Sequence, residues 1–136
     1  MKEMVEQKAI DLLNKCDTVA LSSINENGYP RVCVVSKLKT EGFHKLYFST
    51  GTDSKKTGQF RSNPKASLVY YNVDDAVTLI GNVKIVDDSK VKEGIWQDWM
   101  INHFSGGASD PNYCVLEFTT NEATFCVDNQ LETYTY

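Results

Sequence analysis

Alternating apolar and polar positions dominate this chain, and they predict short β-strands. Residues 18–24 (TVALSSI) alternate in the way typical of a strand with one buried face, and residues 31–38 (RVCVVSKL) are rich in β-branched side chains, which also favour a strand. Asn25–Gly28 separates these two segments as a hairpin turn, in which Gly28 is free to adopt a positive φ. Strand-like segments recur along the rest of the chain, at residues 45–50, 66–72, 76–86, 113–119, 123–128 and 132–136.

Helical patterns only interrupt this succession of strands. Residues 3–15 carry apolar side chains at helical spacing, and a short helix over 55–62 must end before Pro64, which disfavours helical geometry in the residue before it. A third helix of roughly 15 residues is expected after the capping pair Asp87–Asp88. We therefore expect a mostly β fold, an antiparallel barrel formed as a single domain by residues 1–136.

Three details refine the predicted strands. Gly81 lies inside segment 76–86, where it indicates a bulge or a close approach of another backbone. Tyr70 and Tyr71 are neighbours in a strand, so one side chain is expected in the core and the other at the surface or an interface. A turn over 39–42 is expected to join the second and third strands.

Composition and charge exclude several classes of protein. The chain has 14 Lys and Arg against 18 Asp and Glu, a net charge of −4, whereas nucleic-acid binders present a basic face. No apolar run reaches the roughly 18 residues of a membrane span, and the first residues lack a signal-peptide core. We expect a cytoplasmic protein that binds neither nucleic acid nor membrane.

The cysteines do not form a metal-binding pattern. Cys16, Cys33, Cys114 and Cys126 are far apart in the sequence, and no C-x-x-C spacing occurs. Free cysteines in apolar surroundings behave as small hydrophobic residues. Structural thiols and no metal site are the expectation.

The segment FSTGTDSKKTGQFRSNP, residues 48–64, carries the strongest sign of a ligand. A predicted strand runs into a Gly-Thr-Asp-Ser turn, and the next helix begins with Lys55 and Lys56. A helix N-terminus already carries about half a positive charge, so lysines there are unfavourable unless an anion lies over the turn. Backbone N–H groups, hydroxyls and both ammonium groups can then converge on a phosphate. A capped surface helix with solvated lysines is the alternative.

Four segments follow one another along the chain, and the second contains the Ser-x-Lys of Ser54 and Lys56. They are GYPRVCVV, YFSTGTDSKKTGQFRSNPKASLVYYN, VTLIGNVKIV and IWQDWMINHFSGGASDPNYCVLEF. In this order they resemble the pyridoxamine 5'-phosphate oxidase-like family of FMN-binding split barrels, and most closely its general stress protein branch. The resemblance extends from the first helix to about Phe125, and it implies a split β-barrel with antiparallel strands, an N-terminal helix and a late helix.

The resemblance further implies an FMN site at the interface of a homodimer. Residues 31–36 would follow the flavin ring, mostly through backbone groups, and Ser49 and Thr50 would lie near the ribityl-phosphate. Residues 54–56 would hold the phosphate, and Trp96 would approach the ring from the partner subunit. The implied cofactor-binding residues are Arg31, Val32, Cys33, Val34, Val35, Ser36, Ser49, Thr50, Ser54, Lys55, Lys56 and Trp96.

The chain departs from the vitamin B6 oxidases of this family. Those enzymes resemble one another in a C-terminal Arg/His cluster that grips the substrate phosphate, whereas here no arginine follows Arg61 and no histidine follows His103. Ala76 stands where they carry a ring-contacting Gln, and Ser36 where they carry a Lys. These differences argue against oxidation of pyridoxamine phosphate and leave the substrate open.

Other side chains have weaker patterns. Neither His44 nor His103 has a recognisable catalytic partner, so His44 is expected at a strand edge and His103 in a structural role unless it faces the site. Trp99 and Phe104 are expected in the core. Gly106–Gly107 is expected in a loop, with a lid over the flavin as the alternative.

Two functions follow from these patterns. The first is an FMN-dependent oxidoreductase acting on a small molecule, in which the flavin supplies the hydride chemistry and no catalytic side chain is assigned. The second is a non-catalytic, stress-related protein that binds flavin, haem or deazaflavin. A relative that has lost its cofactor is a third possibility, but folding alone does not require the lysines of the turn.

Overall fold

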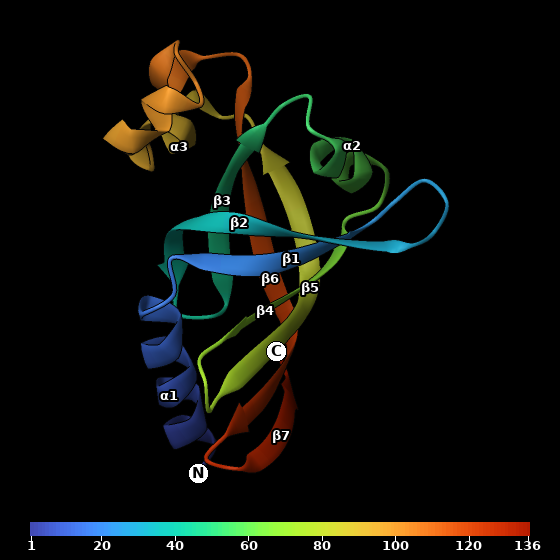
Figure 1. The fold of residues 1–136 in the computed structure, drawn as a ribbon, viewed down its shortest axis with the longest axis vertical. Coiled ribbons are helices and arrows are strands. Elements are labelled where there is room, and N and C mark those ends of the chain that lie inside the picture. Colours follow the sequence, from blue (N-terminus) through green and yellow to red (C-terminus); the bar gives the residue numbers. More distant parts are fainter.

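Seven antiparallel strands form in the computed structural model, which describes residues 1–136 (Figure 1). Most strands fall where alternation predicts them, and the two late segments of the sequence merge into one long strand, β6. The strands are β1 (Thr18–Ile24), β2 (Pro30–Glu41), β3 (Lys45–Gly51), β4 (Lys65–Tyr71), β5 (Ala76–Val86), β6 (Tyr113–Val127) and β7 (Gln130–Thr135).

Two strand pairings join residues far apart in the sequence, β1 with β4 and β3 with β6, and they close the sheet into a barrel. The strand order is β3-β2-β1-β4-β5-β6-β7, and β3 also pairs with β6, so six strands form a closed ring and β7 extends β6 outside it. Closure gives β3 a strand partner on both sides, so β3 is not an exposed edge. The expectation of a mostly antiparallel β-barrel is confirmed.

The barrel core contains the inward-facing half of each strand. The burial of β1 alternates residue by residue, and Leu21, Leu79 and Phe118 from three different strands are at most 1% exposed. The expectation for the tyrosine pair is confirmed, because Tyr70 is buried and donates its hydroxyl to the Ala9 carbonyl at 3.0 Å, whereas Tyr71 is exposed.

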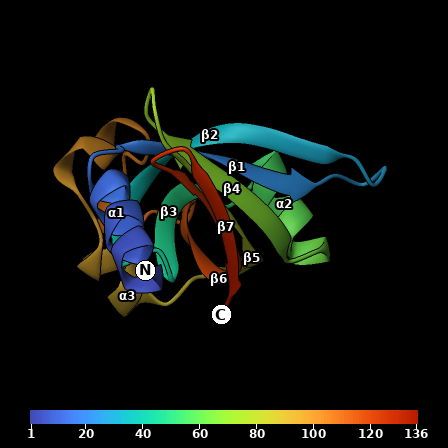
Figure 2. The same ribbon diagram turned by 90° about the horizontal axis from the view of Figure 1, so that it is seen from below.

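Two helices cover the outside of the barrel at separate places, as the two views agree (Figures 1 and 2). Helix α1 (Lys2–Asn14) packs Leu12 and Leu13 into the core, and α2 (Lys55–Ser62) follows the end of β3 with the predicted bounds. No helix of the protein is both long enough and apolar enough to span a membrane.

The third helix is much shorter than the sequence predicts. α3 (Ser89–Gly94) begins at the predicted cap Asp88, but the chain leaves helical geometry after Gly94 and is extended at Gln97. Short 3₁₀ turns follow, η1 (Asp98–Asn102) and η2 (Gly107–Ser109). Glycine is a poor helix former, and the Met100 side chain is buried against the barrel, so packing overrides the helical spacing.

The turn predicted over residues 39–42 is also wrong. Strand β2 continues to Glu41, and the reversal occurs at Gly42–His44, where Gly42 has a φ of 57°. Phe43 within this turn is fully buried in the barrel core. Burial of Phe43 therefore shifts the turn past residues 39–42, where the polar residues alone predict it.

Gly81 marks a β-bulge, as predicted. The register of β5 against β6 shifts between Ile80 and Gly81, and a Cβ placed on Gly81 would lie 1.9 Å from the Thr119 carbonyl oxygen. The two longest-paired strands approach each other here too closely for any side chain.

Asp110 holds together the loop that follows η1. Its carboxylate accepts hydrogen bonds from the backbone N–H groups of Gly106 and Asn112, both at 2.9 Å. Hydrogen bonding by Asn112, then by Gly106, lowers the pKa of Asp110 below its usual value. The loop is thereby fixed in a defined conformation.

We expect Gly81→Ala to lower the free energy of unfolding by about 3 kcal/mol, because the new methyl group must displace a strand backbone. Gly94→Ala is the matched control, since nothing lies within 4 Å of a Cβ at that position. Urea unfolding of both variants measures the difference. Equal stability of the two variants would contradict the close approach.

Asp110→Asn should destabilise the protein more at neutral pH than in acid. A carboxylate with a lowered pKa contributes stability above its unfolded pKa of about 3.9, and loses it as the pH falls through the folded value. Asp98→Asn, a change at an exposed carboxylate, is the control. Unfolding free energies measured from pH 7 downward should converge for wild type and Asp110→Asn; a constant gap would refute the linkage.

Candidate functional site

A cavity of about 250 Å³ opens where β2 and β3 diverge beneath the η1 segment. One wall comes from the strands, one from the start of α2, and one from the aromatic residues in and just after η1. Its lining residues are Val34, Val35, Ser36, Ser49, Thr50, Gly51, Lys56, Trp99, His103 and Phe104.

The strand wall exists because β2 changes partners along its length. Residues 30–36 pair with β1, whereas β2 pairs with β3 only from Lys37 onward, after which the register shifts between Lys37 and Lys39. The edge of β2 that faces away from β1 therefore has no strand partner over residues 30–36. Unpaired backbone N–H and C=O groups along such an edge are free to bind a ligand.

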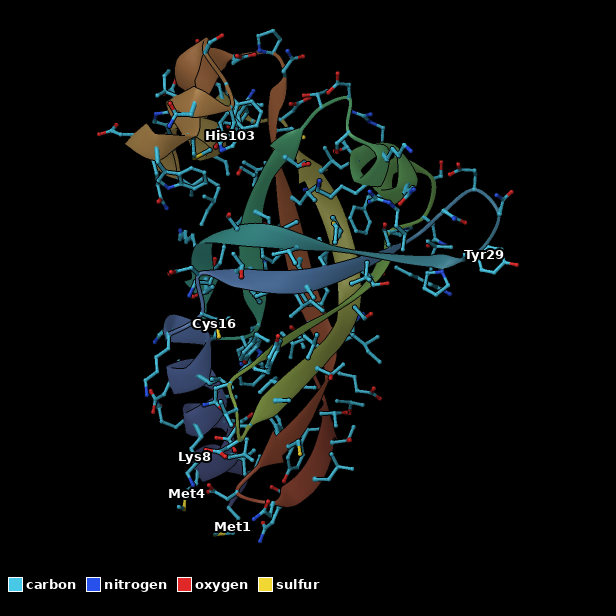
Figure 3. The ribbon with its side chains drawn as sticks, in the orientation of Figure 1. Met1, Met4, Lys8, Cys16, Tyr29 and His103 are labelled. Carbon is cyan, nitrogen blue, oxygen red and sulfur yellow. The ribbon has the colours of Figure 1, made fainter.

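The aromatic wall is supplied by η1 and the residue pair that follows it. The rings of Trp99 and His103 meet edge to face, with centroids 5.9 Å apart, and the Trp99 indole N–H donates to Gln97 at 2.7 Å. Phe104 is buried against Tyr113 of β6, with ring centroids 5.2 Å apart. His103 itself is exposed, and Figure 3 labels it in the segment drawn above β2.

The third wall is the turn between β3 and α2. Ser54 caps α2, and its hydroxyl accepts the backbone N–H of Thr57 at 3.3 Å. The backbone N–H groups of Lys55 and Lys56, in the first helical turn, have no acceptor in the chain. Together with the Lys56 side chain in the cavity, they make this turn a site for an anion.

The hydroxyl groups of Thr50, Ser54 and Thr57 already hydrogen-bond within the turn. Thr57 donates to the Gly51 carbonyl at 2.7 Å, so its oxygen is free to accept from Ser54 at 2.7 Å, and Ser54 in turn can accept from Thr50 at 3.0 Å. This relay fixes the geometry of the turn. It leaves backbone N–H groups and Lys56, rather than hydroxyls, as donors for a ligand.

The loop after η1 and the end of α2 support the turn from outside. Thr52 donates its backbone N–H to Asn112 at 2.7 Å and its hydroxyl to Pro111 at 2.8 Å. Arg61 donates to the Thr52 carbonyl at 3.2 Å, which adds a second cation beside the turn. Burial raises the pKa of Cys114, on the strand next to Thr50, so this thiol stays neutral and poorly nucleophilic.

The sequence-predicted cofactor residues do not all lie in the cavity. Arg31, Val32 and Cys33 lie further along the free edge of β2, and Ser54 lies beneath the turn as the helix cap. Lys55 lines a separate cavity on another face of α2. The predicted residues that line the cavity itself are Val34, Val35, Ser36, Ser49, Thr50 and Lys56.

Trp96 lies outside the cavity of its own chain, and Trp99 lines that cavity. The expectation that Trp96 reaches the flavin ring of a partner subunit stays a prediction. The Trp96 ring packs edge to face on Tyr113 at 5.4 Å, in the small apolar cluster beneath α3. Sequence reasoning placed Trp99 in the core because it assumed one continuous helix, whereas the same expectation for Phe104 is confirmed, since Phe104 is buried in that cluster while also lining the cavity. Gly94, which ends α3, is the signal that could have corrected this assignment.

Solved structures with similar folds come from several bacteria. A Clostridium acetobutylicum protein, described as related to general stress protein 26 of B. subtilis and as belonging to the pyridoxinephosphate oxidase family, is 25% identical with a TM-score of 0.90. The match covers 99% of this chain and 96% of that one.

Two more distant structures share only the fold. A pyridoxamine 5'-phosphate oxidase-related, FMN-binding protein from Nostoc punctiforme has a TM-score of 0.70 at 16% identity, covering 99% of this chain and 94% of that one. A haem-binding protein from Mycobacterium smegmatis has a TM-score of 0.77 at 12% identity, covering 96% and 57%.

The sequence itself identifies the family. No curated protein matches the chain. A sequence model described as pyridoxamine 5'-phosphate oxidase matches residues 5–126, which include β1 to β5, all of β6 except its last residue, and the whole cavity. The chain therefore belongs to the pyridoxamine 5'-phosphate oxidase family and has the split-barrel fold of its general stress protein relatives.

Proposed function

We propose that this protein is an FMN-binding flavoprotein and a redox enzyme acting on a small molecule. One observation carries the proposal: a single cavity joins a cationic helix start, with unpaired N–H groups, to an aromatic wall and a free strand edge. FMN has a terminal phosphate at one end and a flat ring with polar edges at the other. The two ends of the cavity match the two ends of that molecule.

The residues at the phosphate end fit a dianion. Lys56 supplies a formal positive charge inside the cavity, and the unpaired N–H groups of Lys55 and Lys56 add the positive end of the α2 dipole. Arg61 adds positive charge from behind the turn. On a chain with a net charge of −4, this concentration of cations is local and specific.

The residues at the other end fit a flat ring. Val34 and Val35 offer apolar surface beside the unpaired edge of β2, and Trp99 and Phe104 face them across the cavity. Backbone groups of residues 31–36 would hydrogen-bond to the polar edge of the ring. Such contacts orient a flavin and tune its electronics.

We further propose that a homodimer completes the site. The cavity of one chain, at about 250 Å³, is smaller than the roughly 300–1,000 Å³ of ordinary ligand sites. Val32 and Val34 on the outer face of β2 are 67% and 71% exposed, and Val34 lies beside Ala20 and Val69 across the sheet. An apolar sheet face next to an incomplete cavity favours a second copy of the chain as the missing wall.

The redox step would belong to the flavin, which supplies hydride transfer when bound. The chain's own residues would hold the phosphate, orient the ring and exclude water from one face. No arginine follows Arg61 and no histidine follows His103, which argues against a second phosphate-bearing substrate such as pyridoxamine phosphate. Turnover of a reduced nicotinamide with an electron acceptor separates this enzyme from a non-catalytic flavin carrier.

Haem binding is a second candidate, favoured by the position of His103. This histidine lines the cavity beside Trp99 and Phe104, and an imidazole there can serve as an axial ligand of haem iron. The fold is also shared with a haem-binding protein. A Soret band on titration with haemin, lost in His103→Ala, would favour this candidate over FMN.

Lys56→Ala should weaken FMN binding by about tenfold or more, because a hydrogen bond to a charged group contributes roughly 1.5–3 kcal/mol. Quenching of FMN fluorescence measures the affinity. Riboflavin, which lacks the phosphate, should bind wild type and variant equally. Lys84→Ala, at an exposed lysine on β5, is the control and should leave both affinities unchanged. Absence of quenching by the wild-type protein would exclude the FMN site.

Val32→Lys should convert the dimer into a monomer, because it places a charge in the centre of the proposed interface. FMN affinity should fall with it, since the second chain supplies a wall of the site. Val73→Lys is the control, because Val73 is fully exposed in the turn between β4 and β5. Sedimentation analysis that finds a monomeric wild-type protein would refute the proposed assembly.

A further inference from the structure

Gln97 lies next to the aromatic wall of the flavin cavity without lining the cavity itself. Trp99 and Ser36 line both this cavity and an adjoining hollow of about 260 Å³, and Gln97 lines only the hollow. In Figure 3 the label of His103 marks the same segment, drawn above β2. Gln97 can therefore influence a ligand in the flavin cavity through Trp99 rather than by direct contact.

The orientation of the Trp99 ring is not fixed by burial alone, because this residue is 41% exposed. Two contacts with neighbouring side chains hold the ring. Its indole N–H donates to Gln97 Oε1 at 2.7 Å, and the ring meets that of His103 edge to face, with centroids 5.9 Å apart. The hydrogen bond is the directional contact of the two, since it weakens steeply as its angle departs from linearity.

The orientation of the Gln97 amide follows from its two partners. An indole N–H can only donate and a backbone carbonyl can only accept, so Oε1 faces Trp99 and Nε2 faces the Leu38 carbonyl, 3.4 Å away. Leu38 lies in a bulge of β2, because the register against β3 shifts between Lys37 and Lys39 and leaves it without a partner residue. The bulge thus supplies an acceptor on the barrel for this segment.

The backbone of Gln97 is held as well. Its N–H donates to the Met100 sulfur at 3.3 Å, and its carbonyl accepts the Met100 N–H at 2.9 Å. The Met100 side chain is fully buried in the apolar cluster that contains Tyr113 and Phe104. Gln97 is therefore attached to the barrel through both its main chain and its side chain, and its amide oxygen is presented to Trp99.

We infer that Gln97 is a positioning residue for the flavin ring, which it serves by holding the Trp99 indole in place as the cavity wall. This role rests on the proposed FMN site, and it belongs to the ring end of that site alone. Because the indole is ordered before a flat ring binds, its conformational entropy is not lost on binding. Loss of Gln97 should therefore weaken the binding of the ring and leave the contacts to the phosphate unchanged.

Affinities for FMN and riboflavin separate the two ends of the site. Gln97→Leu removes the acceptor of the indole N–H and should weaken both flavins by the same factor, about fivefold, as expected for the loss of one hydrogen bond. Lys56→Ala, by contrast, should weaken FMN alone. Gln7→Leu, at an exposed glutamine of α1, is the matched control and should bind both flavins like wild type. Quenching of flavin fluorescence measures each affinity.

A double-mutant cycle tests whether Gln97 acts through Trp99. Trp99→Phe leaves no indole N–H to hold, so adding Gln97→Leu to this variant should cause no further loss of riboflavin affinity. A glutamine that merely stabilised the fold would lower the affinity again in the double variant.

The indole N–H signals of the flavin-free protein report the hydrogen bond directly. The chain has two tryptophans, and Trp99→Phe identifies the Trp99 signal by its disappearance. In the NMR spectrum of Gln97→Leu, the Trp99 signal should move upfield and exchange faster with solvent, whereas the Trp96 signal should stay in place.

Three results would overturn the role of Gln97 while leaving the proposed FMN site intact. The first is an unchanged Trp99 indole signal in Gln97→Leu. The second is wild-type affinity of that variant for riboflavin. The third is a further loss of affinity in the double variant, equal to that of Gln97→Leu alone. If the wild-type protein binds neither flavin, the proposed function fails, and the role of Gln97 fails with it.

Discussion

The pairing of β3 with β6 is the constraint on which the rest of the molecule depends. This pairing runs from Lys45–Thr119 to Gly51–Tyr113 and closes the six-stranded ring. On its other side, β3 pairs only with the last part of β2, residues 37–41. Because the end of β3 stays paired with β6, it diverges from the first part of β2, and residues 30–36 keep an unpaired edge. The same pairing directs the end of β3 into the turn that starts α2. One closure thus brings a free strand edge and a helix N-terminus to a common cavity.

Charge at that cavity is concentrated rather than general. The chain is acidic overall, yet Lys56, Arg61 and the unpaired N–H groups of α2 surround one turn. Hydroxyl groups complete the turn by hydrogen-bonding to one another, and the loop held by Asp110 supports it through Thr52. The turn is therefore rigid before any ligand arrives, which lowers the entropic cost of binding an anion.

Local patterns in the sequence predicted most of the barrel, and long-range packing decided the rest. Alternation located most of the strands, and Pro64 indicated where α2 ends. The helix after Asp88 was predicted too long, because apolar residues at helical spacing continue past Gly94 while the chain turns to bury Met100. That error moved Trp99 from the cavity into the predicted core. The free edge of β2 could not be predicted either, since it depends on which strands β3 joins.

Helix α2 borders two separate cavities. Lys56 lines the cavity between β2 and β3, whereas Lys55 and Gln59 line a cavity beside the β1–β2 hairpin. Neighbouring residues of the motif SKKTGQ therefore lie in two different environments. We propose that the protein functions by binding FMN in the first of these cavities. The most direct measurement is the absorption spectrum of the protein as purified, with mass spectrometry of any chromophore it releases. The account predicts oxidised flavin bands and the mass of FMN. A Soret band, or a colourless protein that stays colourless after incubation with FMN and dialysis, would contradict it.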